Sequence, residues 1–192
     1  MTDPADNDGG IPFRFRIPPW MALLFFGPIV AGIIMYYAGT RNLNGIPLSQ
    51  PRTLPAEVML LPDGTRATFG GRWSLLYVGR GDCDGTCKEA LSRTSQVQRG
   101  LGEEKSRVQR FFISTTGAPD AAFLAADHPG LLVLTDKLTS RDAVLATLGE
   151  FAEGDVFIAD PLGNVLLRFP AGTATKAIHQ DLTRLLKASQ IG

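Results

Sequence analysis

The stretch from Trp73 to Leu91 constrains this chain most, because it predicts a strand, a loop and a helix in succession. An apolar, β-prone run up to Val78 breaks at 79–81 and passes into helix-compatible sequence. The only two cysteines of the chain, Cys83 and Cys87, stand at this break. A helix N-terminus lowers the pKa of a nearby thiol and favours the thiolate, which attacks disulfides or binds soft metals. Cys83 and Cys87 are therefore the candidate catalytic and metal-binding residues.

The spacing of the two cysteines also fits a second interpretation. Cys87 shares a helical face with Leu91, and cysteine is often buried, so a structural disulfide or a pair of reduced core cysteines would give the same pattern. A C-x-x-x-C pair is less diagnostic than a doubled C-x-x-C zinc pattern. The choice between the two interpretations depends on the rest of the chain.

Length and charge bound the domain count and exclude one class of partner. The chain has 192 residues, 44% of them hydrophobic, with 19 basic and 19 acidic side chains. This composition predicts one globular domain plus a small additional element. The balanced charge gives no indication of nucleic-acid binding.

The segment 20–38 predicts a single transmembrane helix. It contains no charged residue, and roughly 20 apolar residues suffice to span a bilayer. A cleaved signal peptide and a buried core helix are the rival interpretations, but the run is longer than a signal-peptide core and apolar all round. The preceding residues, 1–19, predict a disordered tail. The arginines on the two sides of the run nearly balance, so charge does not decide the orientation of the helix. We place the N-terminus in the cytoplasm and the domain outside, because a thiol pair suits an oxidising compartment.

The residues after this run predict a linker and then a folded domain. Segment 39–55 is rich in proline, glycine and asparagine, which is typical of a tether. Residues 56–192 suffice for one hydrophobic core. The pattern predicts a short hairpin over 56–69, then strands and helices in alternation, and last a hairpin and a helix. The expected later elements are a helix at 86–101, strands at 108–114 and 131–134, helices at 119–127 and 141–148, a hairpin over 155–169 and a helix at 173–189.

This order predicts an α/β fold, a thioredoxin-like sandwich with an N-terminal hairpin addition, preceded by a single transmembrane helix. The cysteine loop then lies at the carboxyl end of a central strand, where open α/β sheets keep their sites.

Several motifs in this order together resemble the Sco/SenC family. They are Gly71-Arg-Trp-Ser-Leu-Leu-Tyr-Val-Gly79 followed by Cys83-Asp-Gly-Thr-Cys87, then 107–114, 160–173 and 181–187. Members of that family are membrane-tethered thioredoxin-fold proteins that help assemble the binuclear copper site of cytochrome c oxidase. The resemblance implies copper(I) as cargo of Cys83 and Cys87, with a cytochrome c oxidase subunit and other copper chaperones as partners. It also implies an inner-membrane anchor with the domain in the periplasm or the mitochondrial intermembrane space.

The sequence departs from the family pattern at two places. Lys88 replaces the proline that follows the second cysteine, and its positive charge would favour a thiolate. The histidine that serves the family as third copper ligand is absent from 149–155, which offers only the hard oxygen donors of Glu150, Glu153 and Asp155. Two thiolates alone suit copper(I), whereas copper(II) prefers an imidazole.

The remaining polar candidates have ordinary structural interpretations. His128, in Ala-Asp-His-Pro-Gly, is expected to be a turn or capping residue, and His179 a surface residue of the last helix. Asp82 and Asp84 are expected to solvate the loop and cap the helix near Thr86.

Three functions remain open. The chain would handle copper(I) through its two thiolates, or reduce a partner's disulfide by thiol exchange, or dock a partner as a degenerate protein with a structural disulfide and no metal. We expect a Sco-like assembly protein with thiol chemistry, and leave open whether it acts as an oxidoreductase or as a non-enzymatic metallochaperone.

Overall fold

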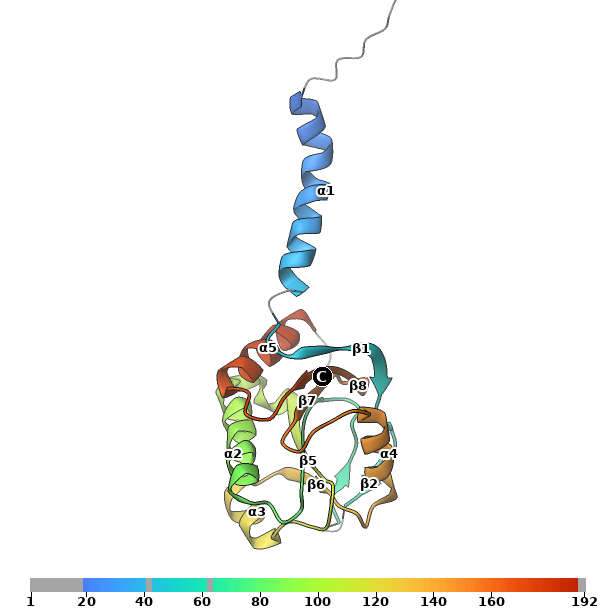
Figure 1. Cartoon of the computed structure of the whole chain (residues 1–192), viewed down its shortest axis with the longest axis vertical. Coiled ribbons are helices and arrows are strands. Elements are labelled where there is room, and N and C mark those ends of the chain that lie inside the picture. The colour runs from blue at the N-terminus through green and yellow to red at the C-terminus, as the bar shows by residue number, and fades with distance from the viewer. Residues whose placement is uncertain (1–18, 41–42, 62–63, 190–192) are drawn as a thin grey trace, which may run out of the picture. The chain divides into compact units, whose positions relative to one another are not determined.

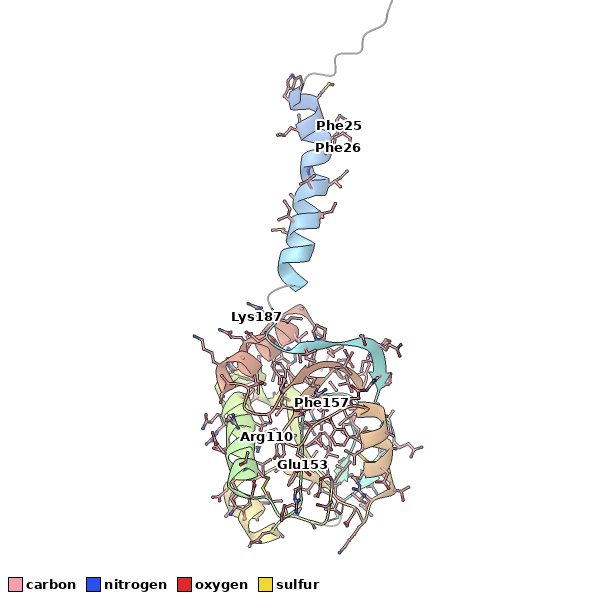
Figure 2. The ribbon with its side chains drawn as sticks, in the orientation of Figure 1. Phe25, Phe26, Arg110, Glu153, Phe157 and Lys187 are labelled. Atoms are coloured by element: carbon pink, nitrogen blue, oxygen red, sulfur yellow. A yellow bond between two sulfur atoms is a disulfide. The ribbon has the colours of Figure 1, made fainter. Side chains whose placement is uncertain are left out.

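The computed structural model describes residues 19–40, 43–61 and 64–189, in two compact units that divide between residues 42 and 43 (Figure 1). The predicted tail lies outside the described residues except for Pro19. In the first unit, helix α1 spans Pro19–Thr40, with Pro28 inside it. Its large apolar side chains are mostly exposed, and Figure 2 shows Phe25 and Phe26 projecting from it.

We expected residues 20–38 to cross a membrane. Within the part of the chain that the structure describes, no helix has the length and apolar character that a membrane crossing requires.

The second unit is built on a six-stranded sheet with the order β1-β8-β7-β4-β5-β6. Strands β4, β5 and β6 run parallel, and β7, β8 and β1 each pair antiparallel with their neighbours. The strands are β1 Ile46–Thr53, β4 Trp73–Gly79, β5 Val108–Ser114, β6 Leu131–Leu134, β7 Val156–Ala159 and β8 Asn164–Phe169. A separate two-stranded hairpin is formed by β2 Met59–Leu60 and β3 Arg66–Ala67.

Helices cover both faces of this sheet, as the thioredoxin-like prediction required. Alternate residues of β4 point to opposite faces, so Leu75 and Tyr77 pack against α2 and α5 while Leu76 and Val78 pack against α4 and the hairpin. Figure 2 shows Phe157 of β7 among the buried side chains of this second face. The helices are α2 Gly85–Gly100, the 3-10 turn η1 Gly102–Arg107, α3 Ala121–Asp127, α4 Thr139–Leu148 and α5 Thr175–Ala188.

The expected linker over 39–55 is wrong in its second half, because Ile46–Thr53 forms the edge strand β1. Two prolines in this strand hide it from sequence analysis, yet an edge strand tolerates proline because one side of its backbone needs no donor. The chain before β1 is also fixed, since Asp181 of α5 accepts hydrogen bonds from Asn44 N at 2.6 Å and Gly45 N at 2.8 Å. The compact unit therefore begins at Leu43 rather than at residue 56.

Candidate functional site

Cys83 and Cys87 form a disulfide at the carboxyl end of the central strand β4. The loop that follows β4 carries Cys83, and the first turn of α2 carries Cys87, with 5.0 Å between their Cα atoms. Each cysteine is only 4% exposed and belongs to the core cluster beneath α2. The structure thus brings the two predicted site residues together in their oxidised form.

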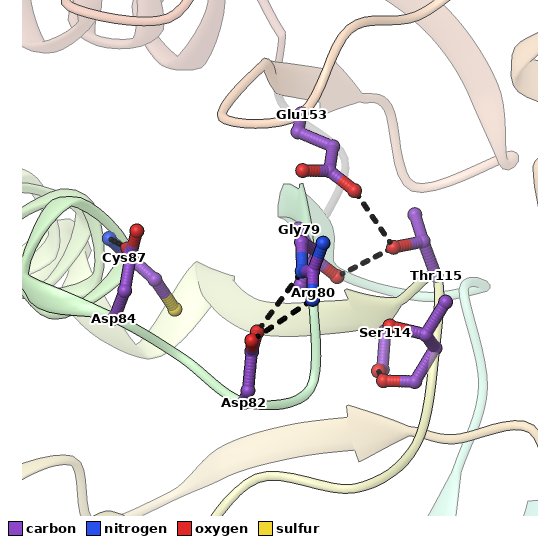
Figure 3. Close-up of polar contacts among 9 residues, drawn as sticks. Gly79, Arg80, Asp82, Asp84, Cys87, Ser114, Thr115 and Glu153 are labelled. Carbon is purple, nitrogen blue, oxygen red and sulfur yellow. Dashed lines mark hydrogen bonds and ion pairs between the residues drawn. The ribbon is translucent and has the colours of Figure 1, made fainter.

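The start of α2 is capped by Asp84, as expected. Its Oδ1 accepts a hydrogen bond from Cys87 N at 2.9 Å, which satisfies one free amide of the first helical turn. Asp82 has a different role, since it forms an exposed ion pair with Arg80 at 3.0 Å (Figure 3). The cap fixes the backbone of Cys87 and sets the direction in which the helix leaves the loop.

Close packing of the backbone holds the cysteine loop in place. Gly81 N donates to Thr116 O at 2.8 Å, and a Cβ atom on Gly81 would overlap that carbonyl and lie 2.7 Å from the carbonyl carbon of Gly117. Cys83 has φ of 38°, and among the described residues it is the one non-glycine residue in the left-handed region. Such conformations cost roughly 1–3 kcal/mol and persist only where the surroundings impose them.

Two acidic side chains, Asp84 and Glu153, act on Tyr77 of β4, and Arg93 opposes them. Thr115 Oγ1 donates to Glu153 Oε1 at 3.4 Å, so the loop before β7 approaches the loop after β5 beside Gly79 (Figure 3). Burial raises the pKa of Tyr77 to about 12, and the carboxylates of Asp84 and Glu153 add to the shift. Tyr77 therefore stays a neutral phenol at physiological pH.

Lys88 does not stand free beside the cysteines. Its Nζ lies over the ring of Phe123 in α3, 4.9 Å from the centroid, where a cation–π contact holds it. The influence of Lys88 on a thiolate stays a prediction.

The three candidate oxygen donors of 149–155 lie in different surroundings in the structure. Asp155 is 1% exposed and accepts bonds from Arg168 and two backbone amides, so it is committed to the fold. Glu150 lines a shallow cleft together with β1 and β8. Of the three carboxylates, only that of Glu153 bonds to the loop after β5, through Thr115.

The two histidines occupy structural positions. His128 is the C-cap of α3, as expected, and its ring meets Phe123 edge-on with centroids 5.2 Å apart. Burial and the nearby Arg110 lower its pKa. His179 is half-buried, and lies beside Gly100 rather than fully on the surface.

Across residues 19–40, 43–61 and 64–189, no three side chains of His, Cys, Asp or Glu gather closely enough to hold a metal ion. The sulfur pair, in reduced form, fits copper(I) and lacks the nitrogen donors that copper(II) prefers.

Sequence analysis missed three residues that shape the site. Tyr77 looks like an ordinary strand residue, Gly81 like a generic loop glycine, and Thr115 carries no motif. The break at 79–81 was the available signal for Gly81, whereas the other two depend on contacts with distant loops.

Comparisons with known proteins agree with this architecture. Residues 73–189 match the family model of a transmembrane-like, thioredoxin-like, C-terminal domain. No curated protein sequence matches the chain.

Solved structures with the same fold include Sco proteins. Apo Sco1 from Thermus thermophilus has a TM-score of 0.61 and 21% identity over 75% of this chain and 97% of its own. ScoI from Bradyrhizobium japonicum with copper bound has a TM-score of 0.52 and 20% identity, over 74% of this chain and 99% of its own. A thiol:disulfide interchange protein from Bacteroides sp. has a TM-score of 0.55 and 12% identity, over 74% of this chain and 93% of its own. The resemblance to Sco/SenC proteins is thus confirmed at the level of the fold.

Proposed function

Because the chain belongs to the transmembrane-like, thioredoxin-like family, we propose that its Cys83–Cys87 pair exchanges with the cysteines of a partner protein. The observation that carries this proposal is the disulfide itself, at the N-terminus of α2 and the carboxyl end of β4. A thiolate there is stabilised by the helix dipole and the free amides of the first turn.

The exchange balances in two steps once a dithiol donor has reduced the pair. One thiolate attacks the partner's disulfide, forms a mixed disulfide and releases one partner thiolate. The second thiolate then attacks the mixed disulfide, so the Cys83–Cys87 bond forms again and the partner leaves with two reduced cysteines.

We extend the proposal to copper(I), carried as cargo by the two reduced thiolates and delivered to a cytochrome c oxidase subunit with a binuclear copper site. The soft sulfur pair supports this, as does the fold that the chain shares with a copper-bound ScoI. The cargo would be handed over directly or through other copper chaperones.

Membrane attachment belongs to the same proposal. Residues 20–38 contain no charge, and the large apolar side chains of α1 are exposed, which supports an anchor in the inner membrane. We place the domain in the periplasm or the intermembrane space, where a disulfide persists. A reporter that is active only in the periplasm should work when fused after Gly192, and activity of a cytoplasm-dependent reporter there would contradict this orientation.

A docking protein with a structural disulfide is the second candidate function. The observation in its favour is burial, because both cysteines are 4% exposed and an exchange reaction must reach one sulfur.

Copper uptake by the full chain in detergent tests the copper proposal. The reduced protein, kept anaerobic, should take up about one copper(I), as the two-thiolate ligand set predicts, and lose it on Cys83→Ser or Cys87→Ser. Copper uptake that survives either substitution, or no uptake at all, would contradict the proposal.

A gain-of-ligand pair tests the geometry of the site. Glu153→His should create a stable copper(II) complex because this position contacts the loops beside the cysteines. The matched Glu150→His substitution should not, because Glu150 faces the cleft at β1 and β8. Equal copper(II) binding by both variants would refute the placement of Glu153.

A further inference from the structure

The loop between β5 and α3 binds the first part of the cysteine loop through its backbone. Thr115 N donates to Gly79 O at 2.8 Å, and Thr115 Oγ1 lies 3.4 Å from the same oxygen (Figure 3). Gly81 N donates to Thr116 O at 2.8 Å. The fit at Gly81 is close, because a Cβ atom added there would lie 2.8 Å from Ala118 N. The position of the cysteine loop therefore depends on the position of this second loop.

Two side chains in turn hold the loop between β5 and α3. Ser114, the last residue of β5, is fully buried, and its hydroxyl donates to Gly117 O at 2.8 Å. Arg141, in the first turn of α4, donates from Nη1 to Thr115 O at 2.8 Å and to Ser114 O at 3.3 Å. Hydrogen bonds from an ionised donor are roughly twice as strong as those between neutral groups. Arg141 is thus a strong link between α4 and this loop.

The link made by Arg141 joins elements on opposite faces of the sheet. Val144 places α4 in the core cluster of one face, whereas Cys83 and Cys87 belong to the core cluster of the other. The side chain of Arg141 is only 12% exposed, and its Nε pairs with the exposed Asp142 at 3.0 Å, which leaves Nη1 to the two carbonyls. The guanidinium therefore connects α4 to the cysteine loop around the carboxyl edge of the sheet.

We propose that Arg141 is a positioning residue for the thiol exchange proposed for Cys83 and Cys87, on which this inference rests. Arg141 fixes the loop between β5 and α3, and this loop fixes the chain that leads to Cys83. Cys87 is fixed separately by the capped first turn of α2. In the reduced protein, the two sulfurs then stay within reach of each other, so the second thiolate attacks a mixed disulfide quickly.

The test follows the reaction of the reduced full chain, in detergent, with oxidised glutathione. One cysteine thiolate attacks the glutathione disulfide, forms a protein–glutathione mixed disulfide and releases one glutathione thiolate. The other cysteine thiolate then displaces the second glutathione, and the Cys83–Cys87 bond forms. Acid quenching, alkylation of the remaining thiols and mass spectrometry give the rate of this second step.

In Arg141→Met the rate of the second step should fall about tenfold, the change that the loss of one charge-assisted hydrogen bond produces. Arg141→Lys should recover part of the rate, because an ammonium group donates to the same carbonyls. The control is Val144→Ala on the same helix, which lowers the stability of the fold by removing buried methyl groups and should leave the rate unchanged. An unchanged rate in Arg141→Met, or equal slowing in Val144→Ala, would overturn the proposal.

Amide hydrogen exchange, followed by NMR, tests the link without any thiol reagent. The Gly81 amide should exchange about tenfold faster in Arg141→Met, while that of Leu76 in the middle of β4 should not change. Equal Gly81 exchange in the two proteins would overturn this inference alone. Failure of the reduced wild-type chain to react with oxidised glutathione would contradict the proposed function, and the positioning role with it.

Discussion

Removing the carboxylate of Asp155 should destabilise the domain far more than removing an exposed carboxylate. Asp155 is 1% exposed and accepts bonds from Ala152 N at 2.8 Å, Arg168 Nε at 2.7 Å and Ala171 N at 3.2 Å. Its own backbone carbonyl accepts from Val78 N at 3.0 Å, which ties this loop to the central strand.

The expected loss follows from what Asp155→Ala leaves behind. A buried charged hydrogen bond contributes about 1.5–3 kcal/mol, and each buried amide left unpaired costs about 1–3 kcal/mol. Relaxation reduces the sum, so the free energy of unfolding should fall by about 3–5 kcal/mol, the range for breaking a buried pair. Urea unfolding followed by circular dichroism measures this loss.

The control for this experiment is Asp136→Ala. Asp136 is exposed, so its removal should change the free energy of unfolding by no more than about 0.5 kcal/mol. A loss below about 1 kcal/mol in Asp155→Ala would show that Asp155 is not committed to the fold. It would then become a ligand candidate again, as the sequence first indicated.

Two further predictions concern His128 and Gly81. The pKa of His128 is lowered from 6.5, so below that pH the unfolded chain binds more protons than the folded one, and stability should decrease as the pH is lowered. The melting temperature should therefore drop between pH 7 and pH 5. His128→Gln should abolish this drop, and His179→Gln should retain it. Gly81→Ala should cost about 1–3 kcal/mol of unfolding free energy and slow thiol exchange, because the methyl group meets the backbone of 116–117. In the control Gly85→Ala, the added methyl group meets nothing within 4 Å, so neither the unfolding free energy nor the rate of thiol exchange should change. Equal effects of the two substitutions in urea unfolding and alkylation assays would contradict the role of Gly81.

The central strands were the most predictable part of the fold. Strand β5 has the bounds expected from the sequence, because a strand buried on both faces appears as a short continuous apolar run. Strand β6 also has the expected bounds although it is an edge strand, because its four residues are all apolar. Edge strand β1 was missed, since its prolines and exposed side chains resemble a linker. Sequence periodicity reports burial, and β1 buries little.

The two cysteines and the helix cap were the predictable parts of the site. Cys83 and Cys87 are the only cysteines, and Asp84 caps the helix as its position predicts. The roles of Glu153 and Asp155 were not separable from the sequence, because neighbours in one loop differ only in which distant elements they contact. Tertiary contacts place the Glu153 carboxylate beside the cysteine loop and bury the Asp155 carboxylate among its hydrogen-bond partners.

The reduction potential of the Cys83–Cys87 bond distinguishes an exchanging thiol pair from a structural disulfide. The full chain is equilibrated in graded dithiol and disulfide buffers, and its reduced thiols are alkylated and counted by mass spectrometry. A pair that exchanges with partner thiols should reduce reversibly between about −270 and −180 mV, the range of thioredoxin and disulfide isomerase, and both cysteines should be alkylated together. A potential below about −300 mV, typical of structural disulfides, would contradict the account and leave the docking function as the better explanation.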